Sequence, residues 1–304
     1  MPGATERYVA KLAATPSVGR PDAVILDLED GVAHADLVKA RERVRALLSH
    51  VGAATTYLAP VMAVRSHAVP DPEFGRDLEA LGPGPSTLLL PKVGSADEVE
   101  EALIALQHAG LSHVGLGVIV ESAGGLENLP AILRAGVGRA SSVKTAVVAV
   151  AFGAEDFAAD VGLPPIVAEP ASPVSQHGSA AAGRLTVLDA ARARIVIAAA
   201  AARVAWRIDT PVLQLRSTAL VEAEARRSRK MGFSGKFCIH PAHVEPLHRG
   251  FEPSASEVAW AQAVLASGAA AGEGVGEVKG ATAKVGQMVD EAVSRQARDI
   301  LAAR

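Results

Sequence analysis

AVILDLEDGV, at residues 23–32, joins a continuous apolar run to three acidic residues, and this combination decides the fold. A run that is apolar at nearly every position is typical of a strand buried on both faces, as in a parallel sheet covered by helices. Similar runs recur along the chain and alternate with helical patterns, so the sequence predicts an α/β fold of strand–helix units. The predicted strands are Ala23–Leu28, Thr56–Val64, Thr87–Leu90, Gly115–Val120, Ala146–Phe152, Val212–Leu215 and Lys236–Ile239.

The repeated units predict a (β/α)₈ TIM barrel, and 304 residues suit such a barrel, which typically takes about 250. Seven runs are one short of eight strands. Because the chain begins at Met1-Pro2-Gly3, where a loop would leave a first strand, we expect the first strand to be truncated. The expected domains are a barrel at 1–266 and, at 267–304, a linker and helix. The predicted helices are Leu37–Leu48, Ala96–Ala109, Leu126–Ala135, Leu188–Ala205, Ala219–Met231 and Gln287–Ala303, with a long loop at Gly162–Arg184.

Composition excludes several classes of partner. The formal net charge is −3 and no basic block stands out, so we expect no nucleic acid. The single cysteine, Cys238, rules out an internal disulfide and suits a reducing cytosol; inside a predicted strand, it is expected to be a buried small hydrophobe. The N-terminus lacks the apolar region of a signal peptide, and the Ala-rich stretch Ile195–Ala205 is too short to span a membrane. We expect a cytoplasmic protein without membrane partners.

Charged residues follow the predicted strands, and in an α/β barrel the carboxyl ends of the strands carry the active site. Carboxylates gathered at one rim repel each other unless a cation lies among them, and Mg²⁺ favours oxygen ligands. Glu121 and Asp156 suit that role, because they follow neighbouring strands, and Arg65 would neutralise developing enolate charge. The residues expected at this rim are Asp27, Glu29, Asp30, Arg65, Lys92, Glu121, Glu155, Asp156 and His240.

Each of these residues also has a purely structural interpretation. An acidic residue after a strand is often a helix N-cap or a loop ion pair, and Asp30 has that alternative. Lys92 after Pro91 would then be solvated, and His240 would belong to a structural turn. Only the joint placement of the charges favours a functional site.

The motifs resemble those of the citrate lyase beta-subunit-like group of the HpcH/HpaI aldolase superfamily, which includes malyl-CoA and citramalyl-CoA lyases. The similar stretches are DLEDGV at 27–32, LLPKVGSADEVE at 89–100, VIVESAGGLENL at 118–129, VAFGAEDFAADVG at 150–162 and GFSGKFCIHPAHVEPL at 232–247. The resemblance implies that Glu121 and Asp156 hold Mg²⁺ and that Glu29 and Asp30 hold metal-bound waters. It also implies that Arg65 binds the keto-acid or enolate oxygen, with Glu121 in the same substrate site.

The resemblance extends to the C-terminus. VGQMVDEAV at 285–293 is similar to a motif that reaches over the barrel of a neighbouring subunit, where its Asp takes part in proton transfer; the matching residue is Asp290. A homo-oligomer, trimer or hexamer, is implied.

Three functions follow as hypotheses. The first is a Mg²⁺-dependent carbon–carbon lyase acting on a CoA thioester of the malyl, citramalyl or citryl type to give an acyl-CoA and a 2-keto acid. The second keeps the site but ends in thioester hydrolysis, as in malate-synthase-like or thioesterase relatives. The third is a binding or regulatory subunit without catalysis, which would show no metal-dependent binding of a keto acid.

Overall fold

The structure, a computed structural model, describes residues 19–53, 60–82, 87–136, 147–165, 180–271, 276–277 and 288–303. It divides into two compact units, Met1–Leu247 and His248–Arg304. The predicted loop at Gly162–Arg184 falls mostly outside the described residues, and α7 begins at Ala180.

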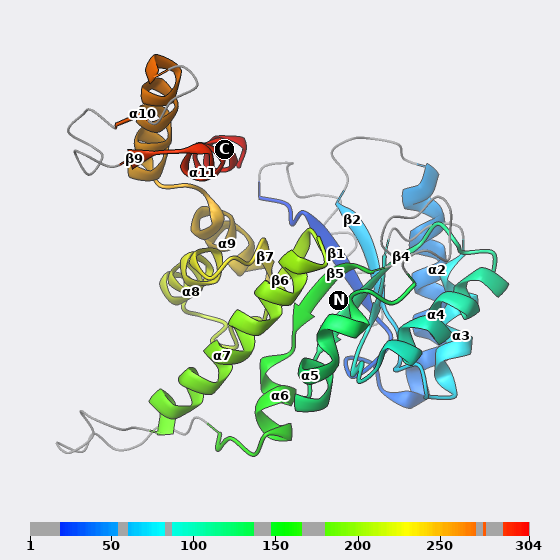
Figure 1. The fold of residues 1–304 in the computed structure, drawn as a ribbon. Coiled ribbons are helices and arrows are strands. Elements are labelled where there is room, and N and C mark those ends of the chain that lie inside the picture. The colour runs from blue at the N-terminus through cyan, green and yellow to red at the C-terminus, as the bar shows by residue number, and fades with distance from the viewer. Residues whose placement is uncertain are drawn as a thin grey trace. The chain divides into compact units, whose positions relative to one another are not determined.

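The first unit is built on a curled sheet of seven parallel strands, which pair in the order of the sequence (Figure 1). The register places Asp27 beside Arg65 at the carboxyl ends of the first two strands. The strands are β1 (Ala23–Asp27), β2 (Val61–Arg65), β3 (Thr87–Leu90), β4 (Gly115–Val120), β5 (Val147–Phe152), β6 (Trp206–Asp209) and β7 (Gly235–Lys236).

The predicted α/β class and parallel sheet are therefore confirmed. In the described part of the chain β1 pairs only with β2 and β7 only with β6, so the sheet is a half-barrel and not a closed ring. The apolar strand runs are buried as predicted: Leu26, Leu88 and Val150 are fully enclosed by the core.

Helices follow the strands and cover one face of the curled sheet (Figure 1). Ser95 is the N-cap residue of α4, since its hydroxyl accepts a hydrogen bond from the backbone N–H of Glu98. The helical elements of this unit are η1 (His34–Asp36), α2 (Leu37–Ala53), α3 (Glu73–Leu81), α4 (Ala96–His108), α5 (Ala123–Ile132), α6 (Ala154–Asp160), α7 (Ala180–Ala201), α8 (Thr218–Lys230) and η3 (Pro241–His243), and α9 (Val244–Phe251) begins in this unit and ends in the second.

The predicted strand at Val212–Leu215 is wrong. The sixth strand is Trp206–Asp209, and the apolar stretch after it lies in a loop where Leu213 and Leu215 are exposed. The sequence pattern did not indicate the true strand because it contains Asp209. A charged residue inside an apolar run argues against a buried strand unless the residues that pair with it are known. The predicted strand Lys236–Ile239 likewise shortens to Gly235–Lys236.

Asp209 is the centre of a buried ionic network that joins the sheet to two helices. Its carboxylate accepts hydrogen bonds from Lys236 Nζ at 2.8 Å, Arg192 Nε at 2.9 Å and Ser228 Oγ at 2.6 Å. Burial alone would raise the pKa of Asp209, but the two cations outweigh it and hold that pKa below its ordinary value. The network thus fixes β6 and β7 against α7 and α8.

We expect Asp209→Asn to lower the free energy of unfolding by about 3 kcal/mol, because two buried cations would lose their counter-charge. Urea denaturation followed by circular dichroism measures this change, and Asp36→Asn, at an exposed residue of η1, is the control. Equal midpoints for the two variants would contradict a stabilising role for the network.

The second unit is a small helical module with its own apolar cluster. Helices α10 (Ala255–Ala271) and α11 (Glu291–Ala302) pack together and enclose Ala261, Val264 and Ala297. A short antiparallel ribbon of β8 (Gly276–Glu277) and β9 (Met288–Val289) accompanies them. The C-terminal helix predicted at Gln287–Ala303 is thus present from Glu291. Among the described helices, none combines the length and the apolar character that crossing a membrane requires.

Candidate active site

Charged side chains gather where β1 to β5 end, at the carboxyl edge of the parallel sheet. Parallel strands bring these ends to one rim, as the sequence predicts. Asp27 and Arg65 end β1 and β2, and the other charged residues predicted there, apart from His240 after β7, follow β1, β3, β4 or β5 within four residues. Several of them are in direct contact.

Arg65 is held by Asp27 in a two-point contact. Its Nε and Nη2 donate to the two carboxylate oxygens of Asp27 at 2.7 Å each, and its Nη1 lies 2.9 Å from Glu29 Oε2. Burial opposes the charge on both groups, yet the pairing keeps the pKa of Asp27 below and that of Arg65 above their ordinary values. Arg65 is therefore a charged and oriented guanidinium. The sequence predicted Asp27 at the rim but gave it no role.

Glu121 is a buried carboxylate at the end of β4. Its Oε2 accepts a hydrogen bond from the backbone N–H of Lys92 at 2.8 Å. Burial, together with repulsion from Glu29 and Asp156, raises the pKa of Glu121 to about 7, against the opposing effects of Lys92 and Arg65. The ionised form of Glu121 thus lacks a sufficient counter-charge.

Gly153 makes room for Glu121. A Cβ atom at position 153 would lie 2.5 Å from Glu121 Cγ and 2.8 Å from Oε1, so only glycine permits this placement. The residue opens the GAED stretch that the sequence singled out, although the sequence alone did not show what the glycine accommodates.

Lys92 is half exposed, yet it pairs with two carboxylates of the rim where the sequence predicted it. Its Nζ lies 2.7 Å from Glu29 Oε1 and 3.5 Å from Asp30 Oδ1. The hydrogen bond to Glu29 raises the pKa of Lys92, against some burial. Lys92 and Arg65 together leave Glu29 between two cations.

The carboxylates fit a hard divalent cation. Glu29 Oε2 is buried and makes no hydrogen bond, despite its proximity to Arg65, and Glu121 carries the raised pKa of an under-compensated anion. Within the described ranges, no three Asp, Glu, His or Cys side chains form a ready-made metal cage. Mg²⁺ is commonly held by one or two carboxylates with water and substrate oxygens completing the shell. Asp156, exposed in the first turn of α6, acts on Glu121 through its charge.

The other predicted residues lie as follows. Asp30 is largely exposed beside Lys92. His240 belongs to a structural turn, since its Nδ1 accepts a hydrogen bond from Ala242 N at the start of η3. Cys238 is exposed, so its predicted burial was wrong. Asp290 is in the second unit, where its carboxylate caps α11 by accepting from Val293 N at 2.9 Å; its catalytic role stays a prediction.

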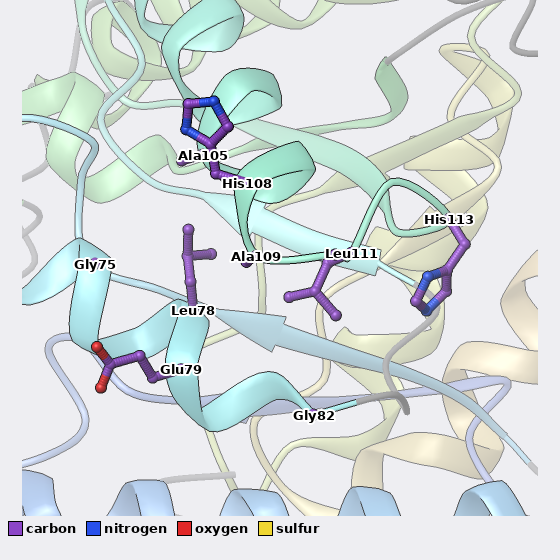
Figure 2. A pocket seen from close by; sticks show the side chains of 10 residues that line it. Gly75, Leu78, Glu79, Gly82, Ala105, His108, Ala109, Leu111 and His113 are labelled. Carbon is purple, nitrogen blue, oxygen red and sulfur yellow. The ribbon is translucent and has the colours of Figure 1, made fainter.

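A cavity of about 680 Å³ lies at the opposite end of the sheet (Figure 2). It is formed where α3 and α4 end, before β3 and β4 begin, and its lining includes Gly75, Leu78 and Leu111. The amino-terminal edge of such a sheet is the stability face, so we do not assign chemistry to this cavity.

The raised pKa of Glu121 predicts a pH dependence of stability in the absence of divalent cations. Protonated Glu121 favours the folded state, so this contribution is complete below pH 4.5 and is lost as the pH rises through about 7. Relative to Glu121→Gln, the wild type should lose about 3 kcal/mol of unfolding free energy between pH 4.5 and 8. Parallel urea titrations of the two proteins test this; a constant difference would contradict it.

Comparisons with known proteins place this chain in a family. A family model described as HpcH/HpaI aldolase/citrate lyase matches residues 2–241. The chain belongs to this family. Within the HpcH/HpaI family, the citrate lyase subunit beta-like protein of Deinococcus radiodurans is 34% identical over 304 residues, covering 99% of this chain and 94% of that protein. Human mitochondrial citramalyl-CoA lyase is 30% identical over 307 residues, covering 98% and 82%.

Solved structures of the HpcH/HpaI family share the architecture. The crystal structure of CitE from Mycobacterium tuberculosis in complex with magnesium, acetoacetate and coenzyme A is 29% identical and has a TM-score of 0.71. The likeness covers 100% of this chain and 95% of that one. The family predicted from the sequence is thus confirmed.

Proposed function

We propose that this chain is a Mg²⁺-dependent carbon–carbon lyase that cleaves a CoA thioester of the malyl, citramalyl or citryl type into an acyl-CoA and a 2-keto acid. Relatives named as citramalyl-CoA lyase and as L-malyl-CoA/beta-methylmalyl-CoA lyase support the reaction class. The M. tuberculosis complexes with magnesium and small carbonyl compounds, including oxaloacetate and pyruvate, support the cofactor and the keto acid.

The observation that carries the proposal is the under-compensated buried carboxylate Glu121 beside the fixed guanidinium of Arg65. A cation at Glu121 and Asp156 would relieve their mutual repulsion, which explains why a folded protein retains such an arrangement. Glu29 and Asp30 would hold the waters around it. A permanently charged arginine at the same rim suits a substrate whose oxygen gains negative charge during reaction.

In this mechanism Arg65 orients the keto-acid oxygen and stabilises its charge. Mg²⁺, when bound, supplies the Lewis acidity that polarises the carbonyl of the 2-keto acid. Asp290 of a neighbouring chain exchanges a proton with the α-carbon of the acyl-CoA. The thioester makes this carbon acidic enough for a carboxylate to act as the base.

Cleavage breaks the bond between the carbinol carbon and the α-carbon of the thioester. The hydroxyl gives its proton to water and becomes the ketone of the 2-keto acid, while the bonding pair passes to the α-carbon as a thioester enolate. That carbon then takes up a proton and leaves as the acyl-CoA. Condensation is the same sequence in reverse.

The proposal includes an assembly. We infer a homo-oligomer, a trimer or hexamer, in which residues 267–304 of one chain cover the barrel of the next and deliver Asp290. We also infer that the working fold is the eight-stranded barrel. Analytical ultracentrifugation tests the assembly, and a mixture of Asp290→Asn and Arg65→Met chains tests the shared site: restored activity requires residues from two chains.

The function is tested by incubating the protein with Mg²⁺ and malyl-, citramalyl-, citryl- or hydroxymethylglutaryl-CoA and identifying products by mass. A 2-keto acid or acetoacetate released together with an acyl-CoA, and abolished by a chelator, is the expected result. Free CoA with an intact hydroxy acid would instead establish a thioesterase. No turnover of any thioester and no Mg²⁺-dependent binding of a keto acid would overturn the enzyme assignment.

A further inference from the structure

Lys92 has an unusual backbone. Its φ is 55°, in the left-handed region that residues other than glycine rarely occupy. Such a conformation persists only where its surroundings determine it, and it concentrates at functional sites. Here Pro91 precedes Lys92, and the buried Val93 follows, with its carbonyl packed so closely on Gly125 that a Cβ there would lie 2.5 Å away.

This turn lets Lys92 donate hydrogen bonds to two carboxylates that follow different strands. The backbone N–H of Lys92 donates to Glu121 Oε2 at 2.8 Å, beyond β4. The ammonium of the same residue donates to Glu29 Oε1 at 2.7 Å, beyond β1. Glu121 and Glu29 repel each other, so Lys92 counteracts that repulsion from β3, which lies between β2 and β4.

We propose that Lys92 is a positioning residue of the active site: its left-handed backbone orients Glu121, and its ammonium holds Glu29 while no cation is bound. The inference rests on the proposed function for the Mg²⁺ site to which Glu121 and Glu29 belong, whereas the contacts of Lys92 with these two carboxylates are observed directly. Replacing the Lys92 side chain separates the two roles. The backbone contact with Glu121 survives the replacement, whereas the ammonium contact with Glu29 is lost.

The ammonium role is tested with Lys92→Met, which removes the charge but keeps the stem, and with Lys92→Arg, which keeps the charge. Lys39→Met, at an exposed lysine of α2, is the matched control. Thermal unfolding is measured with a chelator and again with saturating Mg²⁺, and Mg²⁺ binding is measured by calorimetry.

In chelator we expect Lys92→Met to unfold about 2–4 °C below the wild type and Lys92→Arg close to it, since Glu29 loses one of its two cations only in the first. Saturating Mg²⁺ should raise the Tm of Lys92→Met more than that of the wild type, and its Kd for Mg²⁺ should fall about threefold or more, because one positive charge no longer opposes the ion. A residue with only a structural role would weaken Mg²⁺ binding when replaced. Unchanged Tm and Kd, as in Lys39→Met, would overturn the inference.

The backbone role is tested by comparing Lys92→Gly with Lys92→Ala. Both lack the ammonium, but only glycine adopts a positive φ without strain, so the glycine variant should unfold about 2–4 °C higher. The opposite order would refute the conformational part. If the wild type itself shows no response to Mg²⁺, the proposed function fails, whereas the chelator measurements still decide the role of Lys92.

Discussion

Replacing Asp156 with Asn should abolish Mg²⁺ binding at micromolar to millimolar concentrations and lower kcat/KM by about 1,000-fold or more, since a catalytic metal contributes several kcal/mol to the transition state. The side chain is exposed in the first turn of α6, so the fold should survive the substitution. Calorimetric titration with Mg²⁺ and a lyase assay measure the two effects.

The matched control is Asp97→Asn, which removes an exposed carboxylate from the first turn of α4, the helix that follows β3. It should bind Mg²⁺ and turn over substrate as the wild type does. An Asp156→Asn enzyme that retains both properties would remove Asp156 from the metal site and would leave Glu121 without its proposed partner.

Gly153→Ala should lower kcat by about 100-fold while leaving every charge of the site in place. The added methyl carbon would stand 2.5 Å from Glu121 Cγ, so the carboxylate must move, and a displacement of about 1 Å in a catalytic group can have this effect. The backbone at Gly153 has φ −94°, which alanine adopts without strain, so the effect is steric.

Gly75→Ala is the control for this substitution, because a Cβ at position 75 would meet nothing within 4 Å. It lies in α3, away from the rim, and should leave kcat unchanged. Circular dichroism should show that both variants are folded. Equal activity of the two would mean that Glu121 does not need its observed position.

The sequence predicted those parts of the fold that depend on continuous apolar runs. Five of the seven strands lie where such runs were recognised, and the charged residues that end them meet at one rim as expected. β6 was missed because Asp209 is buried by partners from β7, α7 and α8, which lie 17–27 residues away in the chain. An ion pair of that kind is invisible to a local pattern.

For the site, the sequence predicted residue types but not their contacts. The rim position of Arg65 and Glu121 follows from strand ends alone. The ion pair between Asp27 and Arg65 depends on the β1–β2 register. The space beside Gly153 matters only because Glu121, at the end of the neighbouring strand β4, occupies it. The sequence placed Lys92 at the rim, but its contacts depend on a backbone conformation that its sequence neighbours do not reveal.

The two-point contact between Asp27 and Arg65 has a consequence for ligand binding. A free arginine side chain loses about 2 kcal/mol of rotational freedom when it is immobilised. Here that loss occurs during folding, because both bonds to Asp27 exist before any substrate arrives. If Arg65 binds the substrate as proposed, an incoming anion meets a guanidinium whose orientation is already set, and ligands would be discriminated by the direction from which they present their oxygen.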